Sequence, residues 1–170
     1  MNREIYISEN GLMLAEYLPS DCQADWLDWQ DDETREGYNF IMDMPLSQYQ
    51  NRTIRNRLYA VILRADSPDT PVGIVMISPP HGDPDLAIRV FAPYRGNGLG
   101  TAAFHLAAEY ALAHMNIETL HAGCYEGNMR SQRMLLRCGF VRNPAGDQQE
   151  AHYVTGNPIM QYDYVFQGAI

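Results

Sequence analysis

The chain has 170 residues, 46% of them hydrophobic, with 12 arginines, no lysine and 21 acidic residues, which gives a formal net charge of −9 at pH 7. This length and composition predict one domain with a substantial core, and no stretch is long and apolar enough to predict a membrane span. The acidic balance argues against a nucleic-acid partner, and the absence of lysine excludes both a lysine Schiff base and a Walker-type phosphate loop.

The predicted elements of the N-terminal quarter are a strand near residues 11–17 and a helix that starts at Pro19-Ser20-Asp21 and ends or bends at Gly37. This quarter holds the whole net charge, because residues 1–43 contain eleven acidic residues and two arginines whereas the remaining residues are neutral. A solvated acidic helix and a surface that attracts an amine both explain this charge.

The middle of the chain predicts mainly strands. Residues 38–46 are apolar but irregular, and Ser47 is expected to cap a second short helix. Strands are predicted at 58–64 and 72–77, which form a hairpin, and at 86–91 after a proline-rich turn.

The C-terminal half alternates helices and strands. Apolar residues at helical spacing predict a long helix from Leu99 that lays one face on a sheet. We further expect a strand at 117–125, a helix at 128–137, a strand from 140 and a closing strand near 161–166, whereas 143–157 is polar and reads as a loop or a hairpin end.

The three cysteines, Cys22, Cys124 and Cys138, form an odd set without a C-x-x-C spacing. Reduced thiols in a cytoplasmic protein are therefore expected, and the N-terminus shows no pattern of a secretory signal. Cys124 and Cys138 lie in apolar runs and are expected in the core. The five histidines show no metal-ligand spacing, so no metal site is predicted, and His105 is expected to form an exposed pair with Glu109.

The turn between the fourth predicted strand and the long helix reads Val90-Phe91-Ala92-Pro93-Tyr94-Arg95-Gly96-Asn97-Gly98-Leu99-Gly100-Thr101. Glycine removes the Cβ that would keep a ligand from the backbone, and a helix start offers unpaired N–H groups at the positive end of its dipole. The turn therefore predicts an anion site for a phosphate or pyrophosphate, with a turn that binds nothing as the alternative. Its glycine spacing is one residue shorter than the dinucleotide fingerprint G-x-G-x-x-G.

The arrangement Arg95-x-x-Gly98-x-Gly100, after a strand and opening a helix, resembles the acyl-CoA loop of the GNAT acetyltransferase superfamily. A second stretch, Asn128-x-x-Ser131 followed by Gly139-Phe140, resembles the signature of the branch that includes the ribosomal-protein N-terminal acetyltransferases. The resemblance implies an α+β fold, with a mixed, mainly antiparallel sheet, helices on both faces and a splay between the fourth and fifth strands.

The resemblance also implies a function for residues 1–170 as a single acyltransferase domain. It would transfer acetyl from acetyl-CoA to a primary amine of a protein N-terminus or a small metabolite, by direct attack on the thioester. Loop amides would hold the pyrophosphate, and an N–H near Val90 would polarise the thioester carbonyl. The expected cofactor site comprises Val90, Phe91, Arg95, Gly96, Asn97, Gly98, Leu99, Gly100, Thr101, Asn128 and Arg133.

Two of these residues have simpler alternatives. Asn128 is expected to contact the pantetheine, to cap its helix, or to do both. Arg133 lies in a stripe with Arg130 and Arg137 that either contacts a cofactor phosphate or is only solvated.

The catalytic acid is open. In many relatives a tyrosine serves as the acid, and the corresponding position here is Leu135. Ser131 matches the serine given this role in the ribosomal-protein branch, although simple packing also explains it, and Tyr125 is a second candidate. The thiol of coenzyme A is acidic enough for the reaction to proceed without an acid.

The candidates for the general base are Asp85, Glu126, Glu16 and the acidic run at 31–33, with water relays common in the family. Glu126 is placed best by its proximity to Asn128.

Two other functions stay open: a non-catalytic acyl-CoA sensor or regulatory module, favoured by Leu135, and a fold that holds a different nucleotide. The sequence does not name the acceptor, whose specificity is expected in the N-terminal helices, 38–46 and 143–157. It also leaves open whether the chain forms a homodimer, as is common in the family.

Overall fold

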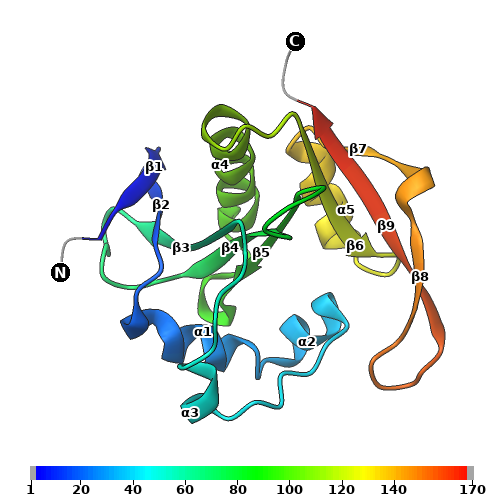
Figure 1. The fold of residues 1–170 in the computed structure, drawn as a ribbon, viewed down its shortest axis with the longest axis horizontal. Helices are drawn as coiled ribbons and strands as arrows, with labels where there is room; N and C mark the ends of the chain where they lie inside the picture. Colours follow the sequence, from blue (N-terminus) through cyan, green and yellow to red (C-terminus); the bar gives the residue numbers. More distant parts are fainter. Residues whose placement is uncertain (1–2, 168–170) are drawn as a thin grey trace.

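The computed structural model describes residues 3–167, in which nine strands form one mixed sheet (Figure 1). The strands are β1 (Ile5–Glu9), β2 (Leu12–Glu16), β3 (Leu58–Arg64), β4 (Gly73–Ser78), β5 (Asp85–Val90), β6 (Thr119–Tyr125), β7 (Val141–Arg142), β8 (Gln148–Ala151) and β9 (Pro158–Gln167). The helices are α1 (Cys22–Asp28), α2 (Asp32–Tyr38), α3 (Leu46–Tyr49), α4 (Leu99–His114) and α5 (Met129–Arg137).

In the described residues the sheet has one parallel strand pair, and the opening in the sheet lies there. The strand order is β1-β2-β3-β4-β5-β6-β9-β7, with β8 also paired to β9, and every pair is antiparallel except β5 with β6. Between β5 and β6 the only register partners in the described residues are Asp85 and His121. The two strands separate beyond this point, which confirms the expected splay.

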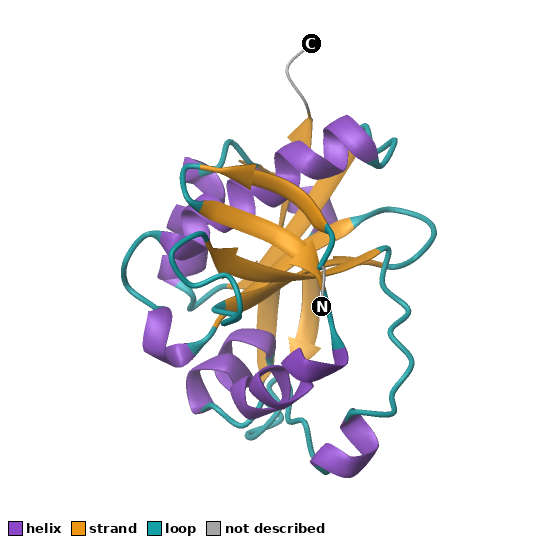
Figure 2. Cartoon of the chain, turned by 90° about the vertical axis from the view of Figure 1, so that its left-hand side faces the viewer, coloured by secondary structure: helices purple, strands orange, loops and turns teal. Residues whose placement is uncertain are grey.

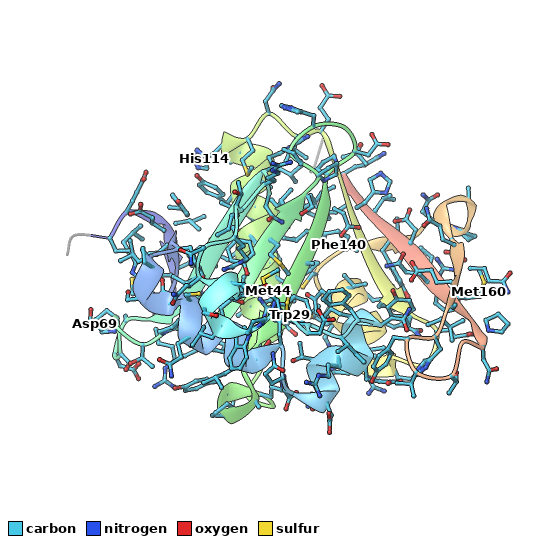
Figure 3. All side chains as sticks on the ribbon, turned by 60° about the horizontal axis from the view of Figure 1, so that its bottom comes forward. Trp29, Met44, Asp69, His114, Phe140 and Met160 are labelled. Carbon is cyan, nitrogen blue, oxygen red and sulfur yellow. The ribbon has the colours of Figure 1, made fainter. Side chains whose placement is uncertain are left out.

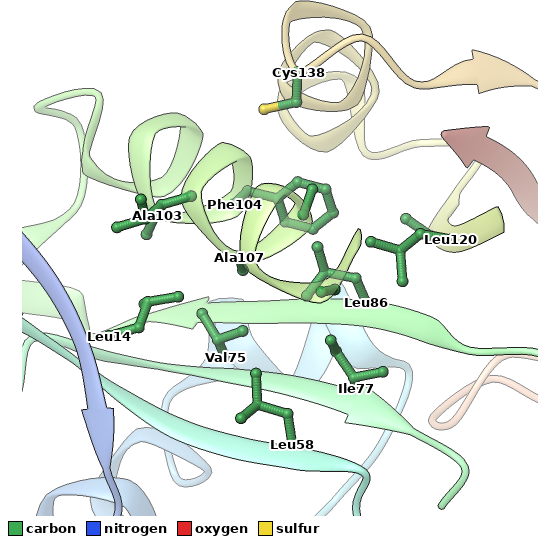
Figure 4. Close-up of a cluster of buried hydrophobic side chains, with 14 of the residues drawn as sticks. Leu14, Leu58, Val75, Ile77, Leu86, Ala103, Phe104, Ala107, Leu120 and Cys138 are labelled. Carbon is green, nitrogen blue, oxygen red and sulfur yellow. The ribbon is translucent and has the colours of Figure 1, made fainter. Parts of the chain in front are cut away.

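Helices cover both faces of the sheet (Figure 2). On one face α4 packs on the strands through alanines, which let the helix come close to the sheet, and Ala103, Ala107 and Ala111 are fully buried. Figure 4 shows this core, in which Phe104 of α4 lies among leucines and valines from the strands. On the opposite face, Trp29 and Met44 (Figure 3) belong to a cluster with Cys22 and Tyr49 that packs α1 against α3.

Most predicted elements are confirmed, including α4, α5 and the strands from β2 to β6. The predicted N-terminal helix is wrong in one respect, because it is two helices: Asp31 accepts a hydrogen bond from the Thr34 N–H at 3.1 Å and starts α2 anew. Strand β1 was not expected, and the polar segment 143–157 contributes β8 as the end of a hairpin with β9. Cys124 and Cys138 are buried, as expected.

Within the part of the chain that the structure describes, no helix is both long and apolar enough to cross a membrane.

Candidate functional site

The opening between β5 and β6 presents backbone groups of β5 that no strand uses. The Phe91 N–H donates to Val72 O at 2.9 Å, so the backbone groups of Phe91 point toward β4. Because backbone groups alternate in direction along a strand, those of Ile88 and Val90 point away from β4. Because β6 is no longer a neighbour at this level, the N–H groups of Ile88 and Val90 face the opening.

The carbonyls beside these N–H groups are already engaged. Ile88 O accepts a hydrogen bond from the Tyr38 hydroxyl at 2.7 Å, and Val90 O accepts one from Arg95 Nε at 2.8 Å. The edge of β5 therefore offers donors, rather than acceptors, to a ligand in the opening.

The glycine turn lies at the wide end of this opening. Gly96 and Gly98 have φ of 89° and 74°, in the left-handed region, and a Cβ added to either would meet nothing within 4 Å. Within residues 3–167 the N–H groups from Gly98 to Thr101, at the start of α4, have no hydrogen-bond acceptor. With the positive end of the helix dipole behind them, these donors have the arrangement with which helix N-termini bind anions.

Gly100 has a different role in the same turn. A Cβ there would lie 3.5 Å from Val90 Cγ2 and 3.7 Å from Met134 Sδ, so the position brings α4 close to β5 and α5. Beside the turn a groove of about 520 Å³ runs along α4 between α5 and the β1–β2 turn, and its lining includes Thr101, His105 and Arg137. Arg133 is exposed and does not line this groove.

Arg95 was expected to contact a cofactor phosphate, but its guanidinium is engaged with side chains of α1, α2 and the turn between them. Its Nη1 lies 2.8 Å from Asp31 Oδ2, and its Nη2 donates to Thr34 Oγ1 at 2.8 Å and to Asp28 Oδ1 at 3.3 Å. Together with the bond to Val90 O, these contacts fasten the glycine turn to α1 and α2.

Three acidic residues of the N-terminal quarter are buried, whereas most of the others in this quarter are exposed. Asp21, Asp25 and Asp28 are at most 5% exposed, and their carboxylates pair with arginines. Neither expected explanation of the acidic charge holds for these three residues. Helix α2, in contrast, carries Asp32, Glu33 and Glu36 exposed to solvent, as a solvated acidic helix predicts. Asp25 and Asp28 are buried beside Arg89 of β5, which is 3% exposed and requires buried counter-charges. Asp21 pairs with Arg3 instead.

Two pKa shifts reflect this network. Burial raises the pKa of Asp28, against the opposing effect of Arg89 and Arg95. For Asp31, partial burial acts upward, but hydrogen bonds from Arg95 and from Thr34 outweigh it and lower the pKa.

The second motif lies beside the opening. Asn128 caps α5, since its Oδ1 accepts from Ser131 N–H at 3.1 Å, while its amide nitrogen has no acceptor within residues 3–167. Ser131 is half-buried, and Leu135 is 1% exposed in the core, so the position of the usual acid is filled by packing.

The other two candidate catalytic residues stand at the end of β6. The Tyr125 hydroxyl donates to Glu150 Oε2 at 2.8 Å, and burial together with this carboxylate raises the pKa of Tyr125. Glu126 is exposed, and its Oε1 accepts from Met160 N–H at 3.1 Å. Glu150 comes from the unpatterned segment 143–157, where no local signal could have pointed to it.

A cleft of about 310 Å³ meets the narrow end of the opening. It is lined by residues of β5, β6, β9 and the β7–β8 connection, among them Asp85, His121, Gly123, Gln161 and Asp163. His121 Nδ1 lies 3.2 Å from both carboxylate oxygens of Asp163. Residues 3–167 contain no group of three or more His, Cys, Asp or Glu side chains placed to hold a metal ion.

Helix α2 closes the site on the side of α1. Its last residues contact the β8–β9 hairpin, where Asn39 donates to Ala151 O at 2.9 Å and accepts from Tyr153 N–H at 2.7 Å. Tyr38, at the start of the irregular segment 38–46, reaches the opening through its hydrogen bond to Ile88 O. The sequence pattern of this segment did not indicate that contact.

Comparison with known proteins identifies the fold and the family. Residues 13–141 match the model of a family described as the acetyltransferase (GNAT) domain. A search of curated proteins found no match.

Among solved structures, a spermidine N-acetyltransferase from Vibrio cholerae in complex with CoA and spermine is 14% identical, with a TM-score of 0.79 over 94% of this chain and 96% of that one. A ribosomal-protein-S5-alanine acetyltransferase from Vibrio fischeri is 14% identical, with a TM-score of 0.76 over 95% of each chain. An acetyltransferase from Salmonella typhimurium that modifies the N-terminal serine of ribosomal protein L7/L12 is 14% identical, with a TM-score of 0.75 over 98% of this chain and 100% of that one. At such identity the neighbours show a shared fold, and they include the branch that the second motif resembles.

Proposed function

The chain belongs to the GNAT acetyltransferase family, and on this basis we propose that it transfers an acetyl group from acetyl-CoA to a primary amine. The observation that carries the proposal is the opening between β5 and β6. It leads from N–H groups on a strand to N–H groups at a helix start, none of which has an acceptor within residues 3–167. A thioester on a long arm that ends in a pyrophosphate is the kind of ligand that such an arrangement fits.

In this proposal the amides from Gly96 to Thr101 hold the pyrophosphate, and the groove beside α4, with Arg137 on its wall, takes the nucleotide end. Two features support the fit: the positive φ of Gly96 and Gly98, and the empty space that a Cβ would enter there. Asn128 and Arg133 would flank the pantetheine arm. Asn128 caps α5 through its Oδ1, so its Nδ2 is available to donate to the arm.

Acetyl-CoA supplies the activated acetyl group, and the protein's own groups orient it and stabilise charge. The N–H groups of Ile88 and Val90 lie where a thioester oxygen would gain negative charge, which is the arrangement of an oxyanion hole. As the amine forms its N–C bond, the C–S bond breaks and its electron pair leaves with the sulfur. Ser131 and Tyr125 are the side chains near α5 and β6 that could protonate the thiolate.

The acceptor class is supported by the structural neighbours, which include a spermidine acetyltransferase and an enzyme that modifies the N-terminal serine of a ribosomal protein. The three cysteines are free and buried, which agrees with a proposed cytoplasmic location.

The test is turnover. The purified protein is mixed with acetyl-CoA and a panel of polyamines and of peptides with free N-termini, and released thiol is followed together with the mass of the acceptor. We expect one class to gain an acetyl group. Binding of acetyl-CoA without acetylation of any amine would instead identify a sensor, as the packed Leu135 allows, and would contradict the proposed catalysis.

A further inference from the structure

We propose that Asp85, which stands where β5 and β6 separate and faces the adjoining cleft, is the general base that accepts the proton of the acceptor amine. This role rests on the acetyl transfer proposed above. It follows from the position of Asp85, from its surroundings and from the contacts of the rival carboxylates.

The position of Asp85 joins the two halves of the site. Asp85 is the residue of β5 that pairs with β6, so the opening for the thioester begins directly beyond it. Its side chain also lines the cleft of about 310 Å³, which reaches the same point from the side of β9. An amine in the cleft and a thioester in the opening would therefore meet next to this carboxylate.

The face of the strand agrees with this arrangement. Leu86 points into the α4 core, so alternation places Asp85 and Arg89 on the opposite face, where Arg89 meets α1. The Ile88 N–H lies about 10 Å along β5 from Asp85 at the usual rise per residue. An amine between the two reaches the carboxylate directly or through one water, which is within the range of general base catalysis.

The surroundings suit a base that works near neutral pH. The half-buried carboxylate of Asp85 has no hydrogen-bond donor within residues 3–167, and it faces Asp163 of β9, His121 of β6 and Tyr38 at the end of α2. Asp83 lines the same cleft, and Arg89, on the same strand face, is committed to Asp25 and Asp28.

Burial, and after it the charge of Asp163, raise the pKa of Asp85 to about 7, while His121 acts in the opposite direction. A carboxyl with this pKa changes protonation in the range where an enzyme of this kind works.

The rival carboxylates are less suited. Glu126 is exposed and accepts a bond from a strand N–H, and Glu16 lies on β2, with β3 and β4 between it and β5. The acidic run is engaged with arginines, since Asp31 holds Arg95 and Glu33 lies 2.8 Å from Arg130.

The proton balance is simple. The amine lone pair forms the N–C bond, the C–S bond breaks and leaves its electron pair on sulfur, and the proton released from nitrogen passes to Asp85. Acidification is therefore expected to stop the reaction by protonating Asp85.

The experiment compares the wild type with Asp85→Asn, with Asp69→Asn as a matched control in an exposed turn and with Glu126→Gln as the rival base. We expect the wild-type kcat/KM to rise with pH through about 7. Asp85→Asn should lower kcat about 100-fold or more and abolish this rise, with acetyl-CoA affinity within twofold of wild type. Asp69→Asn should match the wild type.

Folding supplies a readout that does not depend on activity. Because the pKa of Asp85 is raised in the folded protein, its ionisation destabilises the fold as the pH rises from about 4 to about 7. The melting temperature of Asp85→Asn relative to wild type should therefore be higher at pH 8 than at pH 5, and this also shows that the variant folds.

Three outcomes overturn the assignment in different ways. Retention of wild-type kcat and pH profile by Asp85→Asn contradicts the role of Asp85 alone. Loss of turnover in Glu126→Gln, with an active Asp85→Asn, transfers the role to Glu126. A wild type that binds acetyl-CoA and acetylates no amine contradicts the proposed function, and the role of Asp85 falls with it.

Discussion

Gly98 and Gly156 share a backbone conformation but stand in different surroundings. Their φ values are 74° and 69°, and a Cβ added to either meets nothing within 4 Å, so a substitution strains both alike. Only Gly98 stands at the proposed pyrophosphate site, whereas Gly156 lies in the turn before β9.

This pair separates backbone strain from ligand repulsion. Gly98→Asp and Gly156→Asp should each lose about 1–2 kcal/mol of unfolding free energy, as expected for a side chain in the left-handed region. In calorimetric titration Gly98→Asp should lose acetyl-CoA affinity at least about 100-fold, because a carboxylate would face the pyrophosphate. Equal affinities of the two variants would remove the turn from the binding site.

The pair of Arg95 with Asp31 permits a second test at this scale. Asp31→Asn keeps an oxygen that can cap α2 but removes the charge that lies 2.8 Å from Arg95. Because the pKa of Asp31 is lowered in the folded state, the ionised carboxylate stabilises the fold above its unfolded pKa, and this contribution is lost as the pH falls.

We therefore expect Asp31→Asn to lose about 1 kcal/mol of unfolding free energy in urea at pH 7, a modest loss because the pair is partly exposed. At pH 3 the loss should be clearly smaller, because the wild-type carboxylate is then partly protonated. A loss of the same size at both pH values would mean that the cap, rather than the charge, is what Asp31 contributes.

At the scale of elements, α2 and its caps join four parts of the site (Figure 1). It has only seven residues and cannot be stable alone, so its contacts hold it in place. The partners are Arg95 of the glycine turn, Ile88 of β5, Arg130 of α5, and Ala151 and Tyr153 of the β8–β9 segment.

Asn39, which ends α2, tests this linkage. It has φ of 52° and three hydrogen bonds to the β8–β9 segment, whereas Asn116 has the same φ in the turn after α4 without such bonds in the described residues. Asn39→Ala should cost about 1–2 kcal/mol more than Asn116→Ala, because it loses the hydrogen bonds to Glu150, Ala151 and Tyr153. It should also speed amide exchange in residues 152–157, and equal exchange in both variants would show that α2 does not hold this segment.

The elements also show what sequence patterns can and cannot predict. Helix α4 and the glycine turn were predictable because their signals are local: apolar residues at helical spacing, and glycines at a helix start. The break between α1 and α2 was missed although its signal is local, since Asp31 caps α2 through Thr34, three residues on. The contact of Asp31 with Arg95, 64 residues away, has no local signal. Strand β8 likewise exists only through its pairing with β9.

At the scale of the whole molecule, folding brings part of the acidic N-terminal charge into contact with an arginine of the central sheet. The sequence places the net charge in residues 1–43, but counting cannot tell that Asp25 and Asp28 neutralise Arg89, a residue of a central strand. The motifs correctly located the turn and the cap at Asn128. The cleft formed by Asp85, His121 and Asp163 comes from three strands and was beyond the reach of local patterns, although Asp85 itself was among the candidates.

The measurement that tests the central claim most directly is calorimetric titration of the wild-type protein with acetyl-CoA, desulfo-CoA and ATP. We expect saturable binding of both CoA compounds at one site per chain and much weaker binding of ATP, because the proposed site for the pantetheine arm is the β5–β6 opening and ATP has no such arm. Binding of ATP with equal affinity, or no binding of CoA compounds to the folded protein, would contradict this claim.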